Sequence, residues 1–150
     1  MGQSLAAIKV HLVFNTKNRV KIINPKDDSK LYAYMAEILK DISCPPKIIN
    51  GMPEHIHILF ELNKNLALCK AVEKVKSTSS KWIKKQGIEY ATFQWQGGYA
   101  GFSVSRWDVK KIMRYIDNQK KHHNTQTYED ELIDHLKKEN IDFDEKYLWD

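Results

Sequence analysis

Hydrophobic and polar residues alternate with a period of two in several short stretches of this chain. In residues 54–62, read EHIHILFEL, one side of a strand would carry isoleucine, phenylalanine and leucine, while the other would carry His55 and His57. Similar patterns predict strands over residues 6–14, 47–52 and 99–105. A strand at 54–62 would bury its apolar row and present two imidazoles side by side on its second face.

Between these strands, apolar residues recur at helical spacing. The pattern predicts helices from about 28 to 42, after 65 and ending by 87, from 106 to 123, and a short one to 138. The expected caps are Asp27 or Asp28, Asn65, Ser105 and Thr127. The order strand, helix, strand, strand, helix, strand is that of a ferredoxin-like (RRM-like) α+β fold, a split βαβ antiparallel sheet. We expect an additional C-terminal helix to cross the free face of that sheet, followed by a short helical tail.

The length of 150 residues predicts one domain spanning residues 1–150. Charge is unevenly distributed: residues 1–127 carry 21 Lys and Arg against 10 Asp and Glu, whereas residues 128–150 carry 3 against 9. A basic body favours a polyanionic partner such as nucleic acid, although a solvated basic surface would look the same. The acidic tail is expected to fold back on that body or to meet another subunit.

Several classes of protein do not fit the sequence. We find no segment long and apolar enough to cross a membrane, and no signal peptide, so we expect no membrane partner. Cys44 and Cys69 are not closely spaced, so the sequence contains neither a CxxC pair nor a disulfide framework. A reducing cytoplasm fits best, and neither cysteine has the surroundings of a nucleophile. No phosphate-binding loop, nucleophile elbow or zinc-protease helix is present.

Two regions carry candidate chemistry. Side chains two residues apart on a strand lie about 6–7 Å apart, so His55 and His57 could reach one divalent cation, or could be ordinary polar residues on a solvated face. In the helix expected from 106 to 123, Tyr115 and Gln119 stand one turn apart on the flank of the apolar stripe. A tyrosine hydroxyl beside an amide oxygen and two imidazoles would make a nucleophile next to a three-ligand metal site. The alternative is that Tyr115 packs at the core margin and Gln119 is a surface residue.

The chain resembles the HUH single-tyrosine transposases, small enzymes that move bacterial insertion sequences as single-stranded DNA. The similarity lies in HLVFNTKNR (11–19), PEHIHILFEL (53–62), FQWQGGYAGFSVS (93–105), YIDNQKKHH (115–123) and the tail from 127 to 149, in the family's order. It implies His55, His57 and Gln119 as metal ligands and Tyr115 as the nucleophile. It also implies a DNA strand transferase and endonuclease that cleaves and rejoins element ends through a 5′-phosphotyrosine intermediate, with Mg²⁺ or Mn²⁺ as cofactor.

The resemblance further implies how the enzyme meets its partners. The substrate would be single-stranded DNA, most simply hairpin-containing element ends in a bacterial or archaeal cytoplasm, near the nucleoid during activity. The enzyme would be a homodimer whose active sites combine the histidines of one subunit with the tyrosine of the other. Basic and aromatic residues expected to bind DNA are Lys17, Arg19, Lys21, Trp95, Tyr99 and His122. Two alternatives are a non-catalytic nucleic-acid-binding module of the same fold and a domesticated relative acting on palindromic repeats.

Overall fold

A computed structural model describes residues 2–122 and 126–150 of the chain, apart from the side chain of residue 122. The regular elements, in chain order, are β1 (Lys9–Asn15), α1 (Asp28–Asp41), β2 (Pro46–Met52), β3 (His55–Glu61), α2 (Leu68–Ile83), β4 (Ala100–Val104), α3 (Val109–Asp117), α4 (Gln119–His122) and α5 (Tyr128–Lys138). Short 3₁₀ turns at Lys17–Arg19 and Ile88–Tyr90 lie in the connections. All four predicted strands form, with their ends shifted by a few residues.

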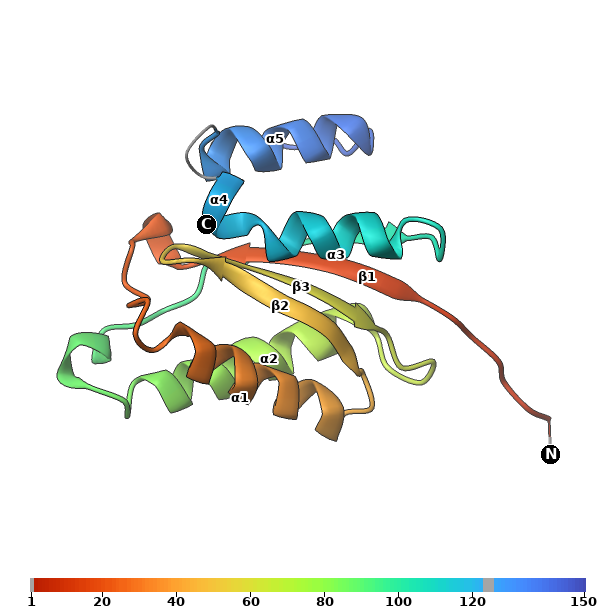
Figure 1. Ribbon diagram of the computed structural model, residues 1–150, viewed down its shortest axis with the longest axis horizontal. Helices are drawn as coiled ribbons and strands as arrows, with labels where there is room; N and C mark the ends of the chain where they lie inside the picture. Colours follow the sequence, from red (N-terminus) through yellow and green to blue (C-terminus); the bar gives the residue numbers. More distant parts are fainter. Residues whose placement is uncertain (1, 123–125) are drawn as a thin grey trace.

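The strands make one antiparallel sheet in the order β2-β3-β1-β4. This is the α+β arrangement that the order of elements predicted, because β1 and β3 lie side by side in the centre and the two helices between strands return over the same face. In Figure 1, α1 and α2 lie below the sheet, while α3, α4 and α5 lie above it. The sheet is therefore the middle layer of three.

The main core lies between the sheet and the pair α1 and α2. It takes one face of each central strand, because alternate residues of a strand point to the same side. The fully buried side chains here are those of Leu12, Phe14, Ile56, Ile58, Phe60, Leu31, Met35, Leu39 and Val75. Removing this apolar surface from water is the main force that fixes the register of β1 against β3.

The second face of the sheet is also covered. A separate apolar cluster joins Val13 of β1 and Phe102 of β4 to Tyr128, Leu132 and Leu136 of α5. The sequence predicted one helix across a free face, but α3 and α5 both pack there. As a consequence, side chains that alternate with the main core, among them His55 and His57, are buried as well.

Two predicted helices differ from the structure for local reasons. The helix expected over 106–123 begins at Val109, because the Ser105 hydroxyl faces the Asp108 carboxylate at 3.3 Å instead of capping a backbone N–H group. It is then interrupted at Asn118, whose φ and ψ of −89° and 10° separate α3 from α4. Asn65 does not cap α2, which starts at Leu68: the Asn65 N–H group is bound to the side chain of Asn63 in a local turn.

The final helix forms as predicted, with the Thr127 hydroxyl accepting a hydrogen bond from the Asp130 N–H group at 3.2 Å. The acidic tail folds back on the basic body. Glu129 forms an ion pair with Arg19 at 3.5 Å, and the Gly98 N–H group donates to the Asp150 carbonyl at 3.0 Å. In the described part of the chain, no helix has the length and apolar character needed to cross a membrane.

Candidate active site

The two strand histidines lie at the beginning of β3, on the second face of the sheet, which α3 and α5 cover. In the register of β1 and β3, His57 is opposite Val13 and His55 is opposite Asn15. Both imidazoles are almost fully buried, at 2% and 0% exposed. They are therefore not solvated surface residues, and the polar atoms of both rings must find partners inside the protein.

His57 is held by a third histidine, His11 of β1. The His11 Nε2 atom lies 2.9 Å from His57 Nδ1, a hydrogen bond between neighbouring strands, and the two rings are stacked 5.1 Å apart. Burial lowers the pKa of His57 to about 4 and lowers that of His11 well below its ordinary value. Both rings are consequently neutral near pH 7, which is the state in which an imidazole nitrogen can bind a metal.

His55 is oriented by the residue before it. The Glu54 Oε1 atom lies 2.9 Å from His55 Nδ1, and since a carboxylate can only accept, Nδ1 carries the hydrogen. The opposite nitrogen, Nε2, forms a hydrogen bond with the Gln119 Oε1 atom at 3.0 Å. A ring nitrogen beside an amide oxygen, with a carboxylate on the other side of the histidine, is an arrangement that can hold and orient a metal ligand.

Gln119 and Tyr115 reach this point from the helices above. The Gln119 amide nitrogen donates to Glu131 Oε1 at 3.2 Å, which is consistent with its oxygen turning toward His55. The Tyr115 hydroxyl also donates to Glu131, and its ring lies edge-on to that of His57, 5.7 Å between centroids. Burial, the charge of Glu131 and the hydrogen bond to it raise the pKa of Tyr115 well above its ordinary value.

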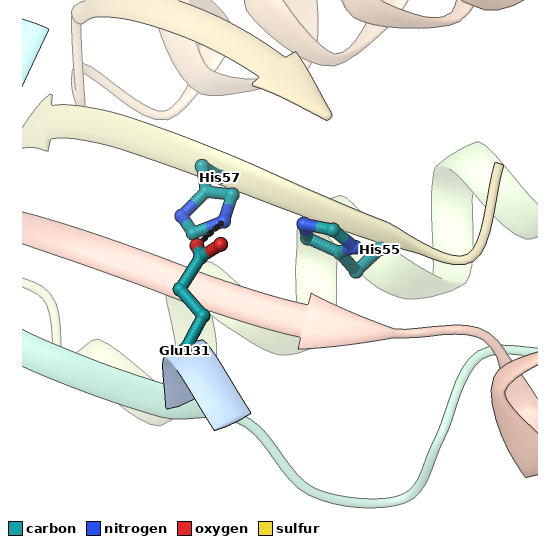
Figure 2. A group of neighbouring side chains, drawn as sticks. All are labelled: His55, His57 and Glu131. Atoms are coloured by element: carbon teal, nitrogen blue, oxygen red, sulfur yellow. Dashed lines mark ion pairs between the residues drawn. The ribbon is translucent and has the colours of Figure 1, made fainter. Parts of the chain in front are cut away.

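Glu131 on α5 is the residue that joins these groups. Figure 2 shows its carboxylate directed at His57, with Oε1 3.2 Å from His57 Nε2. Ligand atoms of His55, His57 and Glu131 all lie within 4.8 Å of one another. Burial alone would raise the pKa of Glu131, but its contacts with His57 and Tyr115 outweigh this effect and lower it to about 2. Two imidazoles, a carboxylate and an amide oxygen are a suitable donor set for a divalent cation such as Mn²⁺.

Sequence reasoning did not select Glu131 or Glu54, although a signal for Glu131 was present. The Thr127 cap fixes the frame of the last helix, in which Tyr128, Leu132 and Leu136 form an apolar stripe. Glu131 stands on that same face, where a carboxylate is buried only if it has a partner. The sequence also did not predict that the ring of Tyr128 stacks on that of His55, with 4.1 Å between the ring centroids.

The residues expected to bind DNA differ in how accessible they are. Lys17 and Lys21 are exposed, and Tyr99 is 39% exposed. Arg19 is engaged by the tail, through Glu129 and through the ring of Trp149, 4.7 Å from its guanidinium carbon. The side chain of His122 lies outside the described residues.

Trp95 corrects one of those expectations. Its ring is edge-on to Phe14 and Phe93 in the core, its Nε1 atom donates to Ser79 Oγ at 3.0 Å, and only 9% of the residue is exposed. It therefore offers no open face on which a base could stack. Apolar packing determined its position. From the sequence alone, an aromatic residue of the core cannot be distinguished from one on which a base stacks.

The fold and the site together define the class of protein. It is an α+β protein in which a tyrosine, two buried histidines and a carboxylate meet on one face of the sheet. A family model described as "Transposase IS200 like" matches residues 4–119, which is most of the chain. The chain therefore belongs to the IS200-like transposase family, whose members are DNA-processing enzymes of DNA transposition. A comparison with curated proteins finds no significant match.

Two solved structures share the fold. One, a candidate transposase from Deinococcus radiodurans R1, has a TM-score of 0.62 at 19% identity, covering 79% of this chain and 96% of the other. The second, a REP-associated tyrosine transposase bound to a REP hairpin, has a TM-score of 0.54 at 13% identity, covering 83% and 72%. At these identities the similarity establishes the common architecture.

Proposed function

We propose that this protein is a metal-dependent single-stranded DNA transposase that cleaves and rejoins element ends through a 5′-phosphotyrosine intermediate. The observation that carries the proposal is the convergence of Tyr115, His57 and Gln119 on Glu131 in a member of the IS200-like family. These residues come from a strand and three helices, so their meeting is a product of the whole fold. A non-catalytic binding module would not need a nucleophile beside a cluster of potential metal ligands.

Tyr115 is the proposed nucleophile. Its hydroxyl oxygen attacks a backbone phosphorus, a P–O bond to the tyrosine forms, and the bond to the 3′ oxygen breaks, leaving a free 3′-OH. The attacked phosphate is exchanged and not hydrolysed, so a 3′-OH can later reverse the step. A phenol is a weak nucleophile while it is protonated, and Glu131 accepts the hydrogen of this hydroxyl. Glu131 thus fixes the position of the attacking hydroxyl oxygen.

His55, His57 and Gln119, together with Glu131, would hold the divalent cation, Mn²⁺ or Mg²⁺. When bound, such a cation polarises phosphoryl oxygens and offsets their growing negative charge. Glu54 orients the ring of His55 through its Nδ1 atom, and His11 orients the ring of His57. All three rings are buried, so bulk water is excluded from around them.

The direct test is formation of a covalent adduct. Labelled single-stranded DNA with hairpins, incubated with the wild-type protein and Mn²⁺, should yield a protein–DNA species that survives a denaturing gel. The Tyr115→Phe protein should yield none, because it lacks the attacking oxygen, while its affinity for the same DNA is retained. An adduct that persists in this variant would move the nucleophile to another residue. Hairpin DNA is chosen because a neighbour of the same fold is bound to a REP hairpin.

The family resemblance also leads us to propose a homodimer with shared sites. Within one described chain, Tyr115 already lies against His57, so a shared site requires α3 to exchange between two subunits and make the same contacts there. The connection that would have to swing is the turn from Ser105 to Asp108. A two-fold pair would bring two nucleophiles together, as excision through two cleavages requires.

A further inference from the structure

Away from the active site, a groove of about 730 Å³ runs between α2 and the segment 94–99. We call it the α2 groove; the lining residues used below are Lys17, Asn18, Cys69, Lys76, Gln96 and Tyr99. Its volume is within the range of about 300–1,000 Å³ that is usual for ligand sites. None of the catalytic candidates lines it, so the mechanism above gives it no role.

The α2 groove presents two lysines, Lys17 and Lys76, that form no ion pair with any residue the structure describes. Lys76 is half-buried, and its Nζ atom donates to the carbonyls of Gln96 and Gly98 at 2.6 and 2.7 Å. An ammonium has three N–H groups, and among the described residues no acceptor contacts the third. Lys17 stands at the other side, exposed. Glu73 and Asp150 also line the groove, but Glu73 is already paired with Lys70 at 3.3 Å.

The surroundings of the groove are strongly basic. Residues 68–85, which form α2 and its end, contain six lysines and one carboxylate. Tyr99 adds an aromatic ring of which 39% is exposed, where a base could stack. Asn18, at the rim, adds an amide in a left-handed backbone conformation with φ of 59°, followed by Arg19 at 55°. Consecutive non-glycine residues in this conformation are costly, and such strain is typical of binding segments.

The α2 groove is linked to the active site by a short chain of contacts. The Gln96 side chain accepts the Asn15 N–H group at 2.7 Å, and the Asn15 side chain accepts the Tyr128 hydroxyl at 3.1 Å. Tyr128 in turn stacks on His55. A DNA strand bound in the groove would therefore lie at the end of the sheet where β1 ends and β3 begins.

We propose that the α2 groove binds unpaired nucleotides of the DNA substrate outside the catalytic centre, with phosphates at Lys17 and Lys76 and a base on Tyr99. The inference rests on the proposed function for the nature of the substrate. Positive charge selects a polyanion, and the exposed ring selects one with free base faces, which a paired duplex does not offer. Such a site would orient the strand that Tyr115 cleaves.

The test measures binding without chemistry. Tyr115→Phe protein in chelator is titrated with a fluorescent single-stranded oligonucleotide and with a blunt duplex of equal length, at several salt concentrations. We expect Lys17→Ala to lower the slope of log affinity against log salt by about 0.7, the value for one lost phosphate contact on a single strand. Tyr99→Leu should weaken single-strand binding by about tenfold. Lys30→Ala, a matched exposed lysine on α1 outside the groove, should change neither quantity.

Cys69 gives a second measurement that needs no substitution in the groove. It is exposed and lines the groove, while Cys44 is buried, so a maleimide will label Cys69 selectively. Saturating single-stranded DNA should slow this labelling, and the duplex should not. Unchanged labelling at saturation, equal protection by duplex, or equal salt slopes for Lys17→Ala and Lys30→Ala would overturn the proposal.

The outcomes also separate this inference from the proposed function. A wild-type adduct formed with Mn²⁺ while Cys69 stays unprotected would leave the catalytic proposal standing and reject the groove. Protection of Cys69 by single strands without any adduct would support the groove and reject the catalytic proposal. No binding of single strands would reject both.

Discussion

Acidification should destabilise this protein through His57. In the folded chain the pKa of His57 is lowered from 6.5 to about 4 by burial. Between these values the unfolded chain binds a proton that the folded chain does not, so stability is lost as the pH falls from 6.5 toward 4. A difference of about 2.5 pKa units corresponds to about 3 kcal/mol, a large part of the roughly 5–15 kcal/mol that stabilises a typical domain.

The contribution of Glu131 falls in a different window. Its folded pKa of about 2 is below the ordinary value of 4.5, so its stabilising effect is fully present above about pH 4.5 and is lost as the pH falls toward 2. Between about pH 7.5 and pH 4.5, changes in the free energy of unfolding therefore report the titration of histidines. His135, which is half-buried with a lowered pKa, provides a comparison within the same range.

The assay is urea unfolding followed by tryptophan fluorescence, in chelator, for wild type, His57→Gln and His135→Gln. We expect the wild type to lose about 2.5 kcal/mol more than His57→Gln over this range, because glutamine has no proton to gain. His135→Gln should keep most of the wild-type dependence. Equal pH dependence of the wild type and His57→Gln would refute the reasoning, since the titrating group would then lie elsewhere.

Three other results are expected. Mn²⁺ should raise the melting temperature of the wild type and support its cleavage, whereas His55→Ala should lose both effects; cleavage by the wild type in excess chelator would exclude the metal mechanism. Glu54→Gln should remain folded and bind Mn²⁺ about 10- to 100-fold more weakly by calorimetry, and unchanged affinity would remove Glu54 from the site. When Tyr115→Phe protein is mixed with His55→Ala/His57→Ala protein under conditions that allow subunit exchange, shared sites should restore partial cleavage. An inactive mixture, or a monomer by light scattering, would assign each site to one chain.

Much of this architecture was determined locally. The alternation in β3 sets which side chains face α1 and α2, and it leaves His55 and His57 on the opposite face whatever the rest of the chain does. The spacing of Tyr115 and Gln119 likewise places them one helical turn apart, even though the helix breaks between them at Asn118. Where prediction failed, at Asn65 and Ser105, the expected cap residue instead forms a hydrogen bond with a polar side chain close to it in the sequence.

The tertiary structure decided what surrounds these residues. Nothing near His57 in the sequence indicates Glu131, which arrives from a helix more than seventy residues later. The covering of the second face, the pairing of His11 with His57 and the burial of Trp95 also depend on contacts between distant segments. Periodicity states which side of an element is apolar but not which element will cover it. That choice depends on the total surface that the whole chain removes from water, and so only the folded protein could show it.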